Sequence, residues 1–302
     1  MEKPTHQKYV NPFTDYGFKK LFGTEPNKEL LVSLLNAMFD HTAQQDPREP
    51  KLVIKDLTYL PTEKLEQYGE RRAVFDVYCE GENGERIIVE MQKASQDFFK
   101  DRSLFYSAFP IIEQGKVGND WDFQLNHVYT IGILNFVFPG GEYDKDCFHH
   151  EVKLMDTKDK HVFYDKLTYV YLEMPKFNKT ENELETMYDK WLFVLKNLSR
   201  LLERPVALQE RVFQRVFEQA EIARFTPDES RIYEESLKHY RDLRNVISSA
   251  ERRGHREGLA EGLAEGRAEG MRDNARRMKE KGYSVEEIAD ITGLAANEID
   301  AL

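Results

Sequence analysis

The chain has 302 residues, with 43 Lys and Arg against 54 Asp and Glu and a formal net charge of -11 at pH 7. Its 15 Tyr, 19 Phe and 40% hydrophobic residues exclude a disordered chain, because they are enough to form a sizeable core. The acidic balance excludes a histone-like protein or one that coats DNA with a basic arm, since phosphate contacts need clustered Lys and Arg.

The first part of the chain alternates between helical and strand patterns. Apolar residues at helical spacing indicate helices, whereas β-rich runs bounded by turn residues indicate strands. In chain order the sequence predicts two helical pieces within 15–39, a strand at 51–60 that Pro61 ends, a hairpin of 72–80 and 85–92, a helix at 97–115 that Pro110 kinks or ends, a central strand at 128–138, and strands at 148–155 and 168–174. This order is typical of a mixed α/β domain.

The remaining residues predict helices at 181–202, at 206–223 and from Asp228 onward. The third helix contains a glycine repeat of period four, and each glycine costs a helix up to ~1 kcal/mol relative to Ala. The repeat consists of Gly254, Gly258, Gly262, Gly266 and Gly270. Two interpretations stay open: a frayed, solvated helical linker, or a stripe on which a second helix packs.

The last residues, 278–302, predict two short helices with a turn at Thr292 and Gly293. Ser284 and Glu287 have the spacing of a capping box at the start of the first helix. This pattern is typical of a small helix-turn-helix, but residues 284–302 contain no Lys or Arg against five acidic residues. We therefore favour a protein-interaction or capping role over the reading of DNA bases.

The two cysteines, Cys79 and Cys147, have no CxxC partner, so neither a disulfide framework nor a thiolate zinc site is predicted. His127, His149, His150 and His161 likewise lack the spacing of zinc ligands. The N-terminal residues have no apolar segment typical of a secretion signal, and no stretch approaches the ~18 apolar residues of a transmembrane helix. We expect a cytoplasmic protein without a membrane partner.

The hairpin carries the residues that suit chemistry. On the strand 85–92 the side chains of Glu90 and Gln92 point to one face, and Asp76 interrupts an apolar run on the neighbouring strand. An unpaired carboxylate buried there would be costly, and a metal ion would remove that cost.

The length of the turn decides whether the two carboxylates meet. A three-residue loop of Glu82, Asn83 and Gly84, with Gly84 in the left-handed conformation, places Asp76 directly opposite Glu90. A two-residue loop places them on opposite faces of the sheet. The metal hypothesis therefore requires the three-residue loop or a compensating bulge.

Together these motifs resemble a known family. Asp76, the hairpin and Glu90-x-Gln92 are preceded by NPFTDYGFKKLFG at 11–23 and followed by an aromatic helix with Arg102 and Tyr106. This set is similar to the recombination-promoting nuclease/putative transposase family of the PD-(D/E)XK nuclease superfamily. The glycine repeat and the ending SVEEIADITGL also resemble the tail of these proteins.

The resemblance implies a restriction-endonuclease-like αβββαβ core with a mixed sheet, followed by an all-helical C-terminal region. It predicts a nuclease-like domain at 1–176, a helical region packing on it at 177–250, the glycine repeat as helix or linker at 251–277, and the tail at 278–302.

The resemblance also implies that Asp76 and Glu90 bind Mg²⁺ or Mn²⁺ and that Gln92 occupies the place where the superfamily usually has a catalytic Lys. Because Gln is neither a cation nor a base, the metal itself must lower the pKa of its water. Asp15 and Lys93 are accessory candidates. For DNA contacts we expect weak, salt-sensitive binding through Lys19, Lys20, Lys93, Lys100 and Arg102.

The predicted function is a metal-dependent DNA endonuclease that hydrolyses phosphodiester bonds, linked to recombination or mobile elements. The alternative is a catalytically weak α/β scaffold with a helical tail for homo-oligomerisation or partner binding. Without the resemblance, Asp76 and Glu90 are also explained as an ordinary cross-strand polar pair neutralised by Arg71 or Lys19.

Overall fold

The computed structural model describes residues 7–45, 52–64, 73–115, 122–139 and 145–302. The predicted loop at 46–50 and Arg71 lie outside these residues. The chain divides into two compact units, Met1–Arg241 and Asp242–Leu302.

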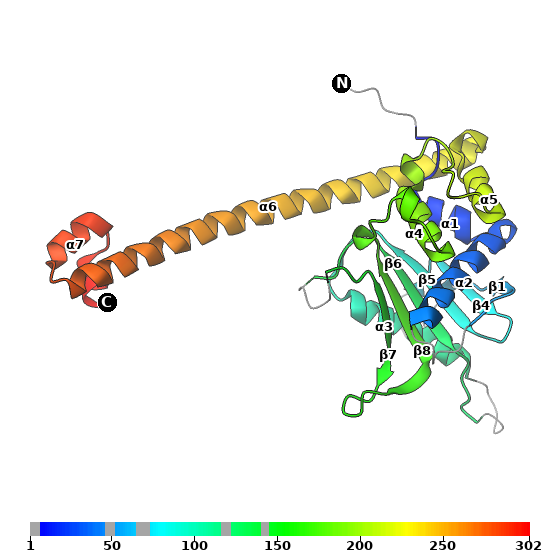
Figure 1. Ribbon diagram of the computed structural model, residues 1–302, viewed down its shortest axis with the longest axis horizontal. Coiled ribbons are helices and arrows are strands. Elements are labelled where there is room, and N and C mark those ends of the chain that lie inside the picture. Colours follow the sequence, from blue (N-terminus) through cyan, green and yellow to red (C-terminus); the bar gives the residue numbers. More distant parts are fainter. Residues whose placement is uncertain (1–6, 46–51, 65–72, 116–121, 140–144) are drawn as a thin grey trace. The chain divides into compact units, whose positions relative to one another are not determined.

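A six-stranded mixed sheet forms the centre of the first unit (Figure 1). Its strand order is β1-β4-β5-β6-β8-β7, and β2 and β3 form a separate pair. The pairs β5/β6 and β6/β8 are parallel, and the other neighbours are antiparallel. The strands are β1 (Leu57–Tyr59), β2 (Glu63–Lys64), β3 (Ala73–Val74), β4 (Val77–Gly81), β5 (Arg86–Gln92), β6 (Val128–Leu134), β7 (His149–Met155) and β8 (Val162–Glu173).

Helices cover both faces of this sheet (Figure 1). Residues of α1, α2, α4 and α5 form the larger core with one face, whereas α3 packs on the other. The α-helices are α1 (Asp15–Phe22), α2 (Lys28–Gln45), α3 (Phe99–Glu113), α4 (Met187–Asn197), α5 (Arg211–Ala220), α6 (Pro227–Glu280), α7 (Val285–Thr292) and α8 (Ala296–Asp300), with short 3-10 turns at Glu25–Asn27, Met174–Lys176, Glu181–Glu183, Leu198–Arg200 and Ile222–Arg224. This is the predicted mixed α/β core with a helical C-terminal region.

Strand β5 shows how the alternation of side chains divides the core. Ile87, Val89 and Met91 join the larger core, whereas Ile88 packs on the α3 side with Phe75 and Tyr78. The next strand, β6, is buried on both faces between two parallel neighbours, as expected for a central strand.

Several predicted boundaries were wrong. The strand at 51–60 is reduced to β1, and Pro110 does not end α3, which continues to Glu113. The central strand stops at Leu134 because the next aromatic residues, Phe136 and Phe138, pack against Phe99 instead. Strand β8 begins earlier, at Val162, where it pairs with the end of β7.

The N-terminal motif builds the start of α1. Asn11 Oδ1 accepts from Phe13 N–H at 2.9 Å, and Thr14 caps the helix by accepting from Gly17 N–H at 3.0 Å. The Asn11 N–H donates to the Tyr233 hydroxyl of α6 at 2.9 Å. The motif therefore has a structural role in addition to any role in the site.

We expect Gly17→Ala to destabilise the first unit. A Cβ at this position would lie 2.2 Å from Asn11 O and 2.7 Å from Thr14 Oγ1, so the capping turn must shift. The loss should be about 2 kcal/mol, measured by urea denaturation of the full chain. Gly258→Ala is the control, because no atom lies within 4 Å of its Cβ position, and it should not destabilise the chain. Equal stability of the Gly17→Ala variant and the wild type would contradict this reading.

His149 makes the stability of the first unit sensitive to acid. Burial lowers the pKa of His149 to about 3, with contributions from His41 and His150, and its Nδ1 lies 2.6 Å from the Tyr188 hydroxyl. Between pH 6.5 and 3 the unfolded chain binds a proton here that the folded chain does not. Stability should therefore fall as the pH drops below 6.5, by up to about 1.4 kcal/mol per unit.

His149→Gln should remove this part of the pH dependence of urea midpoints, whereas the exposed His161→Gln should leave it unchanged. A His149→Gln midpoint that falls with acid as steeply as the wild type would speak against the assignment.

In the second unit α6 continues to Glu280 and is followed by α7 and α8. Ala275, Ile288 and Ile299 form a small core, and Ser284 and Glu287 make the predicted capping box. The five glycines of the repeat are exposed, and no atom lies within 4 Å of the Cβ position at any of them. No described helix is long and apolar enough to span a bilayer.

Candidate active site

The hairpin has the three-residue loop that the metal hypothesis requires. Gly84 takes a φ of 86°, in the left-handed region, and its N–H donates to Gly81 O at 3.1 Å. The register pairs Val77 with Val89, so Asp76, one residue before β4, comes opposite Glu90. Of the two registers that the sequence left open, the structure therefore has the one that the metal hypothesis requires.

Asp76, Glu90 and Gln92 form one connected group. The Asp76 N–H donates to Glu90 Oε1 at 3.3 Å, and Met91 N–H donates to Asp76 Oδ2 at 2.7 Å. Gln92 Nε2 donates to Glu90 Oε2 at 3.1 Å. Glu90 and Gln92 are buried and Asp76 is half-buried. Glu90 Oε1, Glu90 Oε2 and Asp76 Oδ2 therefore accept one hydrogen bond each, which leaves lone pairs for a further ligand.

The surroundings of Asp76 and Glu90 disfavour the ionised form of both carboxyl groups. Burial raises the pKa of Glu90 to about 8, and the neighbouring Asp76 carboxylate raises it further in the same direction. Burial also raises the pKa of Asp76, with the Asp15 charge adding to the effect. A bound cation would reverse both effects, because it favours the ionised carboxylates.

Lys19 does not form the ordinary salt bridge with Asp76 or Glu90, and the other expected partner, Arg71, lies outside the described residues. Among the residues that the structure describes, neither Asp76 nor Glu90 forms an ion pair with Lys or Arg, and Lys19 pairs with Asp15 at 3.1 Å. The charges of Lys19 and Lys93 nevertheless act on Asp76, and that of Arg102 acts on Glu90. The accessory candidates Asp15 and Lys93 therefore lie within electrostatic range of the group.

The other predicted cations have different surroundings. Lys20 pairs with Glu229 of α6 and lies over the Phe225 ring, so a phosphate would have to compete with Glu229 for its charge. Lys100 lies over the Phe138 ring at 5.7 Å. Arg102 forms no ion pair with a described Asp or Glu. Its guanidinium donates to Gln96 at 2.6 Å and lies 5.5 Å from the Tyr106 ring.

Sequence reasoning missed Glu173. The parallel strands pair Gln92 with Leu134 and Leu134 with Glu173, so all three end at the same edge of the sheet. Glu173 is fully buried and contacts His150 and Lys176. The available signal was an acidic residue at the end of an otherwise apolar strand, just before Pro175.

The donor set suits a hard divalent cation. Two carboxylates and an amide supply oxygen ligands, and Mg²⁺ commonly uses one or two carboxylates while water or substrate fills the remaining positions. No group of three or more His, Cys, Asp or Glu side chains that could hold a metal occurs among the described residues. An ion at Asp76 and Glu90 would thus keep several positions for water and phosphate.

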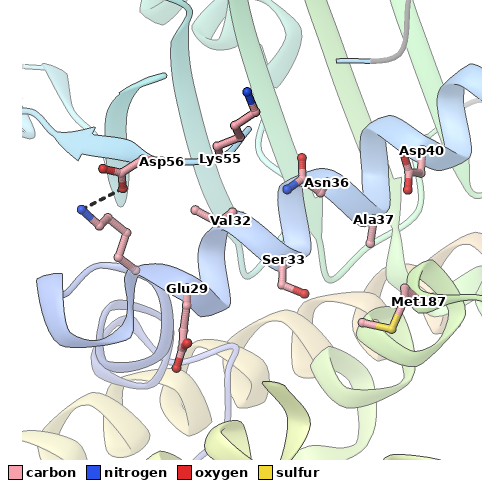
Figure 2. A pocket seen from close by; sticks show the side chains of 10 residues that line it. Glu29, Val32, Ser33, Asn36, Ala37, Asp40, Lys55, Asp56 and Met187 are labelled. Carbon is pink, nitrogen blue, oxygen red and sulfur yellow. Dashed lines mark ion pairs between the residues drawn. The ribbon is translucent and has the colours of Figure 1, made fainter. Parts of the chain in front are cut away.

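A separate hollow lies along α2 (Figure 2). Its polar side chains are already partnered: Lys28 pairs with Asp56 at 2.9 Å, and Asn36 bonds both backbone groups of Ile54. Ser33 Oγ accepts from the Trp191 indole at 3.1 Å. These partners give the hollow a structural role, and the hairpin remains the candidate site.

Comparison with known families agrees with the hairpin geometry. Residues 12–250 match the model of the PD-(D/E)XK nuclease family transposases. The chain belongs to this family. The matched range includes the helix cap Thr14, Asp76, Glu90 and the helices α4 and α5, so the helical region after the sheet is part of the family domain. No curated protein and no solved structure matches the chain.

Proposed function

We propose that the chain is a Mg²⁺- or Mn²⁺-dependent DNA endonuclease that acts in recombination or in the movement of mobile elements. The observation that carries this proposal is the buried group of Asp76, Glu90 and Gln92 on the hairpin of a nuclease-family domain. The family supports a nuclease-like, transposition-related role, and the geometry supports the choice of residues.

In this proposal Asp76 and Glu90 would hold the ion through their carboxylates, and Gln92 fixes the orientation of Glu90 through the hydrogen bond that its side-chain amide donates. When bound, the ion supplies a water of lowered pKa and stabilises negative charge on the phosphate. Gln92 cannot replace the usual Lys as a cation. The nearby Lys93, Lys19 and Arg102 charges are therefore the proposed partners of DNA phosphates, with Lys100 and Lys20 further contributors and Asp15 an accessory acid.

Plasmid nicking tests the proposal. The full chain should nick supercoiled DNA with Mg²⁺ or Mn²⁺, and activity should disappear with EDTA and in Asp76→Ala. Activity should also fall steeply as salt increases, because only a few cations contact phosphate. Nicking that survives EDTA or Asp76→Ala would contradict the proposal.

The second candidate function is a catalytically weak scaffold that assembles through its C-terminal helices. It rests on the exposed apolar side chains Leu259, Leu263 and Met271 in α6 beside the glycine repeat. We also propose, whichever of the two functions holds, the four regions 1–176, 177–250, 251–277 and 278–302 and a cytoplasmic location. Light scattering of a chain truncated before Gly254 tests the scaffold function: a homo-oligomer should become a monomer, and an unchanged state would dismiss assembly through this segment.

A further inference from the structure

Three side chains with complementary chemistry meet at the start of β7 and the end of β8. Cys147 is exposed, and its Sγ lies 4.0 Å from His150 Nδ1. The other ring nitrogen, His150 Nε2, lies 3.0 Å from Glu173 Oε2. His150 and Glu173 are both buried, with 9% and 0% of their surface exposed, so the imidazole is held between thiol and carboxylate.

The state of Glu173 decides which nitrogen carries the proton. Although burial opposes ionisation, hydrogen bonds from Lys176, Phe138 N–H and His150 hold the pKa of Glu173 below its usual value. An ionised carboxylate only accepts hydrogen bonds, so His150 Nε2 is the nitrogen that donates. His150 Nδ1 then presents its lone pair toward the Cys147 thiol.

Two further contacts hold the thiol in place. Cys147 Sγ donates to His149 O at 3.2 Å, and Lys176 Nζ donates to Cys147 O at 3.0 Å. Lys176 also pairs with Glu173. A solvent-accessible thiol close to an imidazole nitrogen that can accept its proton is an environment in which cysteine becomes nucleophilic.

We propose that Cys147 is a modification site that exchanges with small disulfides such as glutathione disulfide. His150 Nδ1 takes the thiol proton as Cys147 Sγ attacks one sulfur of the disulfide. A new S–S bond to Cys147 forms, the disulfide's own S–S bond breaks, and the released thiolate takes up the proton. Cys147 is oxidised and the small disulfide is reduced. Glu173 is a positioning residue that orients the imidazole.

The second cysteine provides an internal contrast. Cys79 is fully buried in β4, and burial raises the pKa of its thiol to about 12. A buried thiol of this kind is unreactive, so all fast reaction of the native chain should come from Cys147.

The test measures the rate at which the native full-length chain reacts with 5,5'-dithiobis(2-nitrobenzoate). We expect one fast equivalent per chain at pH 7, about 10- to 30-fold faster than free cysteine. Cys147→Ser should remove this phase, and intact mass should show one glutathionyl group on the wild type after treatment with glutathione disulfide. His150→Gln should slow the fast phase to about the rate of free cysteine.

A pH profile separates proton transfer from a merely structural effect. Among the described residues, the charged groups close to the pair are Glu173, Lys176 and Asp146, the residue before Cys147, and His149 and Tyr188 are the neighbouring titratable groups. Between pH 8 and 6 the wild-type rate should fall less steeply than the His150→Gln rate, and Glu173→Gln should lie between them. A wild-type rate equal to that of free cysteine at pH 7, or identical profiles for wild type and His150→Gln, would overturn the proposal. The wild-type measurement alone suffices if the variants do not fold.

Discussion

Asp76→Asn is expected to reduce the rate of Mg²⁺-dependent plasmid nicking by at least about 100-fold. The substitution removes a charge that would bind the ion but keeps a side-chain oxygen to accept the Met91 N–H bond of 2.7 Å. The fold should therefore survive, and circular dichroism and urea midpoints should stay close to those of the wild type. A variant that nicks DNA at the wild-type rate would contradict the assignment.

The matched control is Glu82→Gln. Glu82 is an exposed carboxylate in the turn of the same hairpin, and it pairs with Lys55 at 3.8 Å. Its removal changes the net charge by the same amount but leaves the candidate site intact. Nicking by this variant should remain within about twofold of the wild type, because exposed ion pairs contribute little.

Glu90→Gln adds a readout that does not depend on activity. In EDTA at pH 7 this variant should be more stable than the wild type by about 1–3 kcal/mol, because Gln avoids the cost of protonating a buried carboxyl whose pKa is raised to about 8. Added Mg²⁺ should raise the melting temperature of the wild type by mass action but leave that of Glu90→Gln unchanged. Equal shifts in the melting temperature of both proteins would mean that Mg²⁺ binds elsewhere on the chain. The result of the nicking assay would then need a separate explanation.

The hairpin was predictable because its geometry is local. Turn chemistry at Asn83 and Gly84 located the turn and left two loop lengths open, and the three-residue loop of the structure sets the register that brings Asp76 opposite Glu90. The alternation of β5 then placed Gln92 beside Glu90. Each step needed only residues within a short segment of the chain.

The position of Glu173 at the same edge of the sheet as Gln92 was not predictable, because it depends on which strands become neighbours. The parallel pairings that align Gln92, Leu134 and Glu173 join segments about 40 residues apart, and no local pattern encodes that contact. The contact of His150 with Glu173 follows from the same pairing, since β7 returns along β8. The boundary of β6 was wrong for a related reason: Phe136 and Phe138 pack with Phe99 of α3.

The glycine repeat was recognised in the sequence, but its energetic consequence depends on the structure. All five glycines lie inside α6 with open space around them, so the helix carries their full conformational cost and gains no packing in return. Relative to Ala the cost is roughly 5 kcal/mol over the repeat. This stretch should therefore be the part of α6 that opens most readily.

Replacing Gly254, Gly258, Gly262, Gly266 and Gly270 with Ala is expected to slow amide hydrogen exchange across 254–270 of the full chain by at least about tenfold. The control is Gly282→Ala, which also meets no atom within 4 Å but has a φ of +83°. There the same substitution should weaken the end of α6 by about 1 kcal/mol, because Ala disfavours that conformation. Unchanged exchange in the five-residue variant would contradict the conclusion that these glycines make this stretch of α6 open most readily.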